Sequence, residues 1–349
     1  MSTFGALNTA YRGLTAAQQG MNVAGQNIAN AATEGYTRQR VQQSAIAAPA
    51  QGLMGTGRPE AGNGVSVDGI ARLGNNFLDA GVRSAGAQAG YAGVRSSALQ
   101  GIEATLQEPG DNGISDSLQK FWSAWQGVAN QPGESGPAGQ LLQAGTELSA
   151  KIAAGYQALT SQWSTTRGEA QADVDTVNSA ATQVASLNAA IRTTTAAGGS
   201  ANELIDARAK LTESITRLTG ATVREQPDGT VDVHVAGNAL VMGTSVRTLE
   251  LSGTSADTLN TPVQLQWSDT KTAAGPDGGS IAGALSLLAP ANSSATGGTF
   301  AETAAKYNAF AGSLRDAVNT LHAGAKTSSG GTAGDFSAHP PQESRRPSP

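Results

Sequence analysis

The strongest pattern of apolar and polar positions lies in residues 1–35. Large apolar residues recur there every seven positions, and an alanine follows each of them by three, which is the a/d spacing of a helix that packs against other helices. The positions of this seam are Leu7, Ala10, Leu14, Ala17, Met21, Ala24, Ile28 and Ala31. We therefore predict an N-terminal heptad helix of coiled-coil type over residues 1–35.

The surroundings of this seam are almost uncharged. Arg12 is the one charged residue among the first 33, and neutral residues such as Asn8 and Gln18 stand where a solvated coiled coil carries charges. We interpret the segment as a helix that is buried among many neighbours in an assembly. An internal helix of a globular domain is the alternative that the pattern leaves open.

Beyond this helix the pattern changes. Glycine and proline punctuate residues 36–74, which predicts an extended connector, and Val65 and Val67 alternate with polar residues as in a short strand. Residues 75–220 are compatible with a long helical domain, and Ser200 and Glu203 have the spacing of a capping box. The packing positions that we single out before the helix stop at Gly220 are Leu204, Leu211, Ile215 and Leu218.

Residues 221–297 alternate as strands do. Turn sequences at Pro227-Asp228-Gly229 and Gly237-Asn238 separate the runs, so we predict a small inserted β-rich domain. A helix then returns over residues 298–324, with packing positions at Tyr307, Leu314, Val318 and Leu321. Residues 325–349 are rich in Gly, Ser and Pro and are predicted to be a disordered tail.

The fold class that these segments predict is mainly α with an inserted β domain. Its parts are the N-terminal coiled-coil-type helix, a long helical bundle domain, a small β-rich domain and the returning helix. Composition changes the picture in one respect: Gly is 44 of 349 residues, while charged residues reach 14 % and aromatic residues 4 %. Small neutral residues favour helices that approach each other closely.

Charge and composition also exclude several classes of function. A net charge of −5 without a Lys/Arg-rich run predicts no nucleic-acid partner, and no apolar stretch approaches the ~18 residues of a membrane span. The chain contains no Cys, which excludes disulfides, thiolate zinc sites and thiol nucleophiles. The first residues lack the pattern of a cleaved secretory signal.

The sequence offers no constellation for catalysis. None of the three histidines has a second ligand at metal-site spacing, and Asp173 and Asp175 are two positions apart on a predicted helix, so they point in different directions. We therefore predict no catalytic, metal-binding or cofactor-binding site, no cofactor, and a protein that is not an enzyme.

A resemblance begins directly after the heptads. The run Asn-Ile-Ala-Asn-Ala-Ala-Thr-Glu-Gly-Tyr-Thr-Arg at residues 27–38 resembles the signature of the bacterial flagellar rod, hook and hook-associated family. Its specified positions are Asn27, Ala29, Asn30, Thr33, Gly35, Tyr36 and Arg38. Asn30 and Thr33 suit a helix end, and Gly35 releases the chain into extended structure. Residues 62–67, 204–211 and 228–231 resemble the hook-associated members of this family.

The resemblance implies a structural subunit that joins hook to filament by helical packing and lateral contacts. It implies export by the flagellar type III apparatus without a cleaved signal, and an extracellular place at the hook–filament junction. The implied partners are copies of the chain, the hook protein, the next hook-associated protein and the flagellin side of the junction. The seam on residues 1–35 would pack against neighbouring terminal helices in the inner tube.

One departure from the family concerns the C-terminus. Members of the family close with a second heptad helix that pairs with the first, and Gly, Ser and Pro-rich sequence stands in its place here, so we expect a truncation or a reading-frame change near Gly334. This leaves recognition by the family's export chaperone open, because that chaperone grips the C-terminal helix.

Two alternatives compete with the junction subunit. A hook or distal-rod axial protein shares the signature at residues 27–38, but such proteins are expected to be β-rich beyond the terminal helix, unlike residues 75–220. A cell-wall hydrolase or effector exported through the flagellum needs a catalytic acid or nucleophile in a cleft, which the sequence does not supply.

Overall fold

The structure is a computed structural model that describes residues 3–47, 62–254, 256, 258–327 and 330–337. The chain divides into two compact units. Unit 1 comprises residues 1–90, 173–250 and 265–282, and unit 2 comprises residues 91–172, 251–264 and 283–349. The long helices α2 and α4 contribute residues to both.

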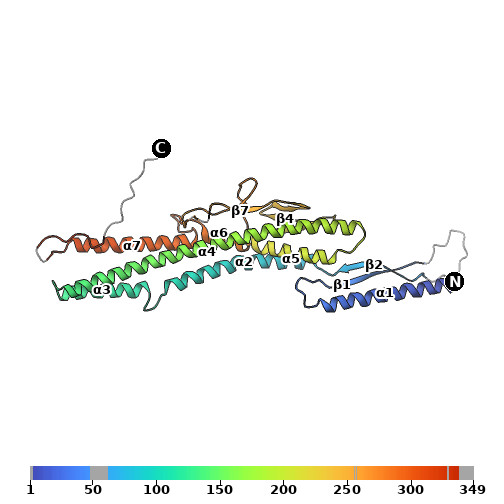
Figure 1. Cartoon of the computed structure of the whole chain (residues 1–349), viewed down its shortest axis with the longest axis horizontal. Helices are drawn as coiled ribbons and strands as arrows, with labels where there is room; N and C mark the ends of the chain where they lie inside the picture. Colours follow the sequence, from blue (N-terminus) through green and yellow to red (C-terminus); the bar gives the residue numbers. More distant parts are fainter. Residues whose placement is uncertain (1–2, 48–61, 255, 257, 328–329, 338–349) are drawn as a thin grey trace. The chain divides into compact units, whose positions relative to one another are not determined.

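The described elements follow the chain in the order shown in Figure 1. The helices are α1 (Thr3–Ala29), α2 (Asn76–Leu106), α3 (Ile114–Asn130), α4 (Ser135–Ala196), α5 (Asn202–Thr219), α6 (Gly279–Leu288) and α7 (Thr299–Ala323). The strands are β1 (Gln39–Ala45), β2 (Val65–Arg72), β3 (Thr222–Glu225), β4 (Val231–Val235), β5 (Asn238–Met242), β6 (Ser245–Val246), β7 (Leu249–Leu251) and β8 (Leu265–Trp267). The predicted fold class, mainly α with a small β domain, is confirmed.

The N-terminal part of unit 1 consists of α1 and a two-stranded antiparallel hairpin, β1 with β2, which lies alongside it (Figure 1). We call residues 3–47 and 62–74 the arm. The predicted connector at residues 36–74 thus contains a hairpin, and its residues 48–61 lie outside the described residues. A bulge between Gln42 and Gln43 interrupts the ladder.

The rest of unit 1 packs helices against a four-stranded antiparallel sheet of order β3-β4-β5-β6. The apolar stripe of α4 supplies this core: Val174, Val177 and Val184 are each 0 % exposed. The strands contribute the alternate residues of β4, Val233 and Val235, which are also fully buried. Apolar burial of this kind is the main force that holds the sheet to the helices.

Unit 2 is a helical bundle built from α3, the first part of α4 and α7. Trp163 of α4 is 1 % exposed, and its indole Nε1 donates to the carbonyl oxygen of Leu288 at 3.1 Å. Gly155 of α4 lies where a Cβ atom would collide with the ring of Tyr307 on α7. Glycine at this position therefore permits the close approach of the two helices.

The structure differs from the sequence expectations at several element ends. The helix predicted for residues 1–35 ends at Ala29, and its residues 1–2 lie outside the described residues. The segment predicted to be β-rich, residues 221–297, also contains the buried helix α6. Glycines at positions 275, 278 and 279 concealed this short helix, because they resemble the punctuation of a loop.

The predicted capping box at the start of α5 is absent. The residue that precedes the helix is Ala201, which makes no side-chain capping bond, because the helix starts one position later than the box requires. Glu203 is thereby free to bind elsewhere, as described below.

The predicted packing positions of the helices are mostly buried. Ile215, Leu218, Tyr307 and Val318 are buried, and Leu204, Leu211 and Leu314 are partly buried. Leu321 is the exception: it is 72 % exposed, so its predicted packing role is wrong within the described chain. It lies in the last turn of α7, where the facing helix does not cover it.

The prediction of a disordered tail is wrong for the described residues 330–337. Ser337 forms backbone hydrogen bonds with the side chain of Asn319, and Phe336 packs against the rings of Trp125 and His322. One aromatic residue in a run of small residues is enough to anchor the segment. Residues 338–349 lie outside the described residues.

Candidate functional site

Helix α1 has two apolar faces. Ala16 and Val23, which are 3 % and 7 % exposed, lie on the side that the hairpin covers. At about 100° per residue, Leu14 lies on the opposite side from Val23. The large apolar residues on that opposite side are all exposed: Phe4, Leu7, Tyr11, Leu14, Met21 and Ile28. We call these six residues the outer stripe.

The structure places the predicted seam on this outer side. Its eight residues, Leu7 to Ala31, are all exposed, and Ala31 lies beyond the end of the helix. The described part of the chain therefore does not cover the seam; the internal contact of α1 runs through Ala16 and Val23. Sequence reasoning missed Phe4 and Tyr11, although each stands three positions before a seam leucine, which is the signal that could have found them.

Asn27 fixes the hairpin to α1. Its amide Nδ2 donates to the carbonyl oxygen of Gln39 at 2.9 Å, while its Oδ1 accepts from the Gln39 amide N–H at 2.9 Å. The Tyr36 hydroxyl donates to the same Oδ1, also at 2.9 Å. One helical side chain thus satisfies both backbone groups at the start of β1, as a neighbouring strand would.

The remaining signature residues form the turn between helix and strand. Ala29 ends α1, the Asn30 amide donates to the carbonyl of Gln26, and the Thr33 hydroxyl donates to Asn30 Oδ1. Gly35 has a φ of +82°, which glycine adopts without strain. Arg38 is exposed. The signature therefore encodes a tight reversal that returns the chain along α1.

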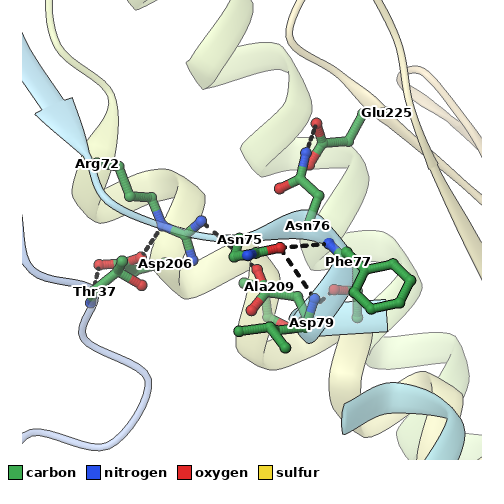
Figure 2. A network of polar contacts seen from close by, with 11 residues as sticks. Thr37, Arg72, Asn75, Asn76, Phe77, Asp79, Asp206, Ala209 and Glu225 are labelled. Atoms are coloured by element: carbon green, nitrogen blue, oxygen red, sulfur yellow. Dashed lines mark hydrogen bonds and ion pairs between the residues drawn. The ribbon is translucent and has the colours of Figure 1, made fainter. Parts of the chain in front are cut away.

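Asp206 of α5 anchors this reversal to the rest of unit 1 (Figure 2). Its Oδ2 accepts from the backbone N–H of Thr37 at 3.0 Å, and its Oδ1 accepts from Arg72 Nε at 2.6 Å. Asp206 is 8 % exposed, so the Arg72 ion pair is largely removed from water. Charged hydrogen bonds in such surroundings are stronger than neutral ones.

The same side of α5 makes further polar contacts with the arm. Gln39 Nε2 donates to Glu203 Oε1 at 3.2 Å, and Lys210 forms an exposed ion pair with Glu34 at 3.1 Å. Positions 203, 206 and 210 are three and four apart, so they share one helix face. Burial, and then the negative charges of Asp206 and Glu203, raise the pKa of the Tyr36 hydroxyl.

The first residues of α2 complete the network. Asn75 Oδ1 accepts from the backbone N–H groups of Phe77 and Leu78 at 3.0 and 3.2 Å, which caps the helix (Figure 2). The neighbouring Asn76 donates to Glu225 at the end of β3 at 2.8 Å. Asn75 and Asn76 thus fix the point at which the chain leaves β2 and enters α2.

Arg208 extends from the opposite side of α5, because two positions along a helix turn the direction by about 200°. It donates to the carbonyl of Gly229 at 2.7 Å and to Asn188 Oδ1 at 2.8 Å. Its burial lowers the pKa of the guanidinium. Helix α5 therefore holds the arm through Asp206 and the four-stranded sheet through Arg208.

Asn188 and Asn178 of α4 repeat the geometry of Asn27. Asn188 pairs with both the N–H and the carbonyl of Val231, and Asn178 pairs with both groups of Leu249. We call this pairing of a helical asparagine with both the N–H and the carbonyl of one residue outside the helix an asparagine clamp. Sequence reasoning missed these clamps.

The chemistry of these groups is structural. Among the described residues, no three His, Cys, Asp or Glu side chains are grouped so that they could hold a metal ion. The helices of the described part are too short or too polar to cross a membrane. Asp206 accepts two hydrogen bonds and fixes backbone, so the arrangement positions α1 and leaves its outer stripe accessible.

Sequence comparisons agree with this architecture. Residues 99–336 match the profile of the flagellar hook-associated protein FlgK helical domain, and residues 7–37 match that of the flagella basal body rod protein. Flagellar hook-associated protein 1 of Escherichia coli K12 is 29 % identical over 260 residues, which cover 74 % of this chain and 46 % of that protein. The Bacillus subtilis 168 protein of the same name is 28 % identical over 266 residues, covering 74 % and 50 %.

A solved structure also matches. It is the flagellar hook junction protein FlgK from Burkholderia pseudomallei, with a TM-score of 0.59, 20 % identity, and coverage of 75 % of this chain and 46 % of that one. The chain spans about half the length of the curated relatives that it matches. Since the helical-domain profile covers more than half of the chain, the chain belongs to the flagellar hook-associated protein FlgK family.

Proposed function

We propose that this chain is a structural subunit of the bacterial flagellum that joins hook to filament outside the cell. The subunit acts by packing. The outer stripe of α1 contacts the terminal helices of neighbouring copies, and the helical domain of residues 75–220 makes lateral contacts. The proposed partners are copies of the chain, the hook protein, and the next hook-associated protein on the flagellin side. No catalytic step is part of this function.

The observation that carries the proposal is the outer stripe itself. Leu7, Met21 and Ile28 are 67 %, 67 % and 78 % exposed on a helix whose other face is already closed by its own hairpin. Burying one side chain of this size gains about 1.5–3 kcal/mol, so several of them in register can drive association. A contiguous exposed apolar surface marks an interaction site in a folded protein.

The clamps support the same function because they limit how α1 can be presented. Asn27 fixes the hairpin against α1, and Asp206 fixes the start of the hairpin to α5. A preorganised helix loses less conformational freedom when it associates than a mobile one does. The helical-domain match at residues 99–336 favours a hook-associated subunit over the hook or distal-rod alternative.

The test is a charge in the centre of the outer stripe. Leu14→Asp, in cells that lack their own hook-associated protein 1, should leave the exported chain soluble and block its incorporation, because association would bury a carboxylate without a partner. Electron microscopy of hook–filament junctions and swimming assays measure the effect. Normal junctions with this variant would contradict the proposal, as would an unaltered chain that never enters the junction.

The matched control is Asn8→Asp. It adds the same charge to an exposed position on α1, about 120° away from Leu14 around the helix. This variant should assemble as the unaltered chain does. If Asn8→Asp and Leu14→Asp fail alike, charge on α1 blocks export or assembly wherever it lies, and the stripe has no special role.

A further inference from the structure

A second binding arrangement lies in unit 2, far along the chain from the outer stripe. Asn319 of α7 is buried, at 6 % exposure, and its amide forms a clamp on Ser337. Nδ2 donates to the Ser337 carbonyl at 2.8 Å, and Oδ1 accepts from the Ser337 N–H at 2.9 Å. In unit 1 the clamped residues belong to strands, but here the clamped residue lies at a bend, a few positions after the bridge between Lys326 and Thr332.

The residue before the clamped one is held by aromatic rings. The ring of Phe336 lies 5.4 Å from that of Trp125, 5.7 Å from that of His322 and 6.0 Å from that of Phe121, between ring centroids. We call this set of three rings the socket. Tilted and edge-on ring pairs at such distances add stabilisation beyond the burial of their area.

Helix α4 forms the floor of the socket at Gly145. A Cβ atom at this position would lie 3.5 Å from Phe336 Cε1 and 3.3 Å from Phe121 Cε2, so glycine leaves the room that the two rings occupy. A cavity of about 430 Å³ continues from Phe336 between α4 and α7 as far as Tyr307. The socket therefore opens onto unfilled space instead of ending at the ring.

The third contact is made with the backbone of the segment. His322 Nδ1 lies 2.6 Å from the carbonyl oxygen of Gly334, within hydrogen-bond distance. Contacts with the backbone of Gly334, the side chain of Phe336 and the backbone of Ser337 hold a short peptide segment, bent at its last two residues, by one aromatic anchor. Hydrogen bonds to the main chain and a pocket for one side chain are means by which folded domains recognise peptide segments.

We infer that α3, α4 and α7 form a receptor for a short peptide segment that carries an aromatic side chain next to the residue clamped by Asn319. The chain's own residues 334–337 occupy this receptor. The inference is independent of the outer stripe, because no residue of α1 takes part.

The intramolecular position sets the expected affinity. An effective concentration of about 1 mM is typical of a tethered segment, so we expect the free peptide to bind with a Kd on this scale. Binding of a free peptide is therefore measurable once the tethered segment is released.

The experiment empties the socket in the full chain and refills it. Phe336→Ala should shift the Trp125 indole resonance in a two-dimensional NMR spectrum, and the peptide Gly-Thr-Ala-Gly-Asp-Phe-Ser, residues 331–337, should restore it with saturation below about 5 mM. The same peptide with Phe replaced by Ala should not bind. Unaltered chain should bind the peptide at least tenfold more weakly, because its receptor is occupied.

Two variants distinguish specific binding in the receptor from a general effect of mutating α7. Adding Asn319→Ala to Phe336→Ala should weaken peptide binding at least tenfold, whereas adding Phe310→Ala, an exposed ring on the same helix, should not change it. A folded Phe336→Ala chain that shows no saturable binding up to about 5 mM overturns the inference. So does binding that ignores Asn319.

A further measurement covers the case in which Phe336→Ala does not fold, as judged by circular dichroism. Asn319→Ala alone should then remove the protection of the Ser337 amide against hydrogen exchange, while Phe310→Ala leaves it protected. Persisting protection in Asn319→Ala would contradict the receptor.

Discussion

Helices α1 and α4 carry the same kind of apolar pattern, but the chain buries the apolar face of α4 and leaves that of α1 exposed. Both are long, rich in small residues and apolar at spacings of three, four and seven. Val174, Val177 and Val184 of α4 are fully buried by the chain itself, whereas Leu7, Leu14 and Met21 of α1 are more than half exposed. The periodic pattern therefore predicts that a face will be covered, and it does not say by which chain.

The difference lies in the faces around the apolar residues. In α1, the side opposite the seam carries Ala16, Val23 and Asn27, which the hairpin already occupies. In α4, the polar residues of the stripe, Asn178 and Asn188, hold strands of the same chain. A helix that has used one face internally and still carries large apolar residues on the other is built for a partner.

The largest expected effect tests the difference between the two helices directly. Val177→Asp should destabilise unit 1 by more than about 4 kcal/mol, since it buries a carboxylate without a partner, while Leu14→Asp should change the stability of the isolated chain by less than about 1 kcal/mol. Urea unfolding followed by circular dichroism measures both. Equal losses would show that the chain itself covers the outer stripe.

The clamps give the next largest effect. Asn188→Ala should cost about 2–4 kcal/mol, because it leaves the buried backbone of Val231 and one contact of Arg208 unpaired. Asn27→Ala should cost less, about 1–2 kcal/mol, because water can reach the groups that it releases. Thermal unfolding of the two variants should rank them in this order, and the reverse order would contradict the role of burial.

The sequence predicted much of this fold and little of its fine positioning. Strong periodicity located α1, α5 and α7, and turn pairs at Pro227-Asp228-Gly229 and Gly237-Asn238 located the sheet. The clamps were not predicted because they join residues between 12 and 71 positions apart, and a local sequence pattern carries no information about such distant pairs. A signal was present: Asn188 stands in register between Val184 and Ile191, where an apolar residue is expected.

The candidate site was predicted in the same uneven way. The seam residues were found from their spacing, but Asp206 was noted only as part of a resemblance, since nothing in its neighbours indicates a contact with Thr37 and Arg72. The prediction of a disordered tail failed for a related reason. Composition averaged over 25 residues gives no weight to one phenylalanine, Phe336, that packs in the socket.

A smaller effect tests how the arm is held. Asp206→Asn keeps the size of the side chain but removes its charge and places an amide group where two donors converge, so local opening of the arm should become about 1–3 kcal/mol easier. Hydrogen exchange at the Thr37 amide measures this opening. Glu34→Gln, which breaks the exposed pair with Lys210, is the control and should shift exchange by less than about 0.5 kcal/mol.

The smallest effect concerns the exposed ion pair between Arg247 and Asp269. The side chain of Arg247 donates two hydrogen bonds to Asp269, at 2.9 and 2.8 Å, and this contact lowers the pKa of Asp269 from its usual 3.8 to about 2. The folded chain therefore binds fewer protons than the unfolded chain between these pH values, so the stabilisation is complete above about pH 4 and is lost as the pH falls toward 2. Asp269→Asn keeps the stacking of Arg247 on Trp267 and should lower the urea midpoint slightly at pH 7. This difference from the unaltered chain should shrink below pH 4. A difference that grows on acidification would show that another carboxylate governs the acid stability of this region.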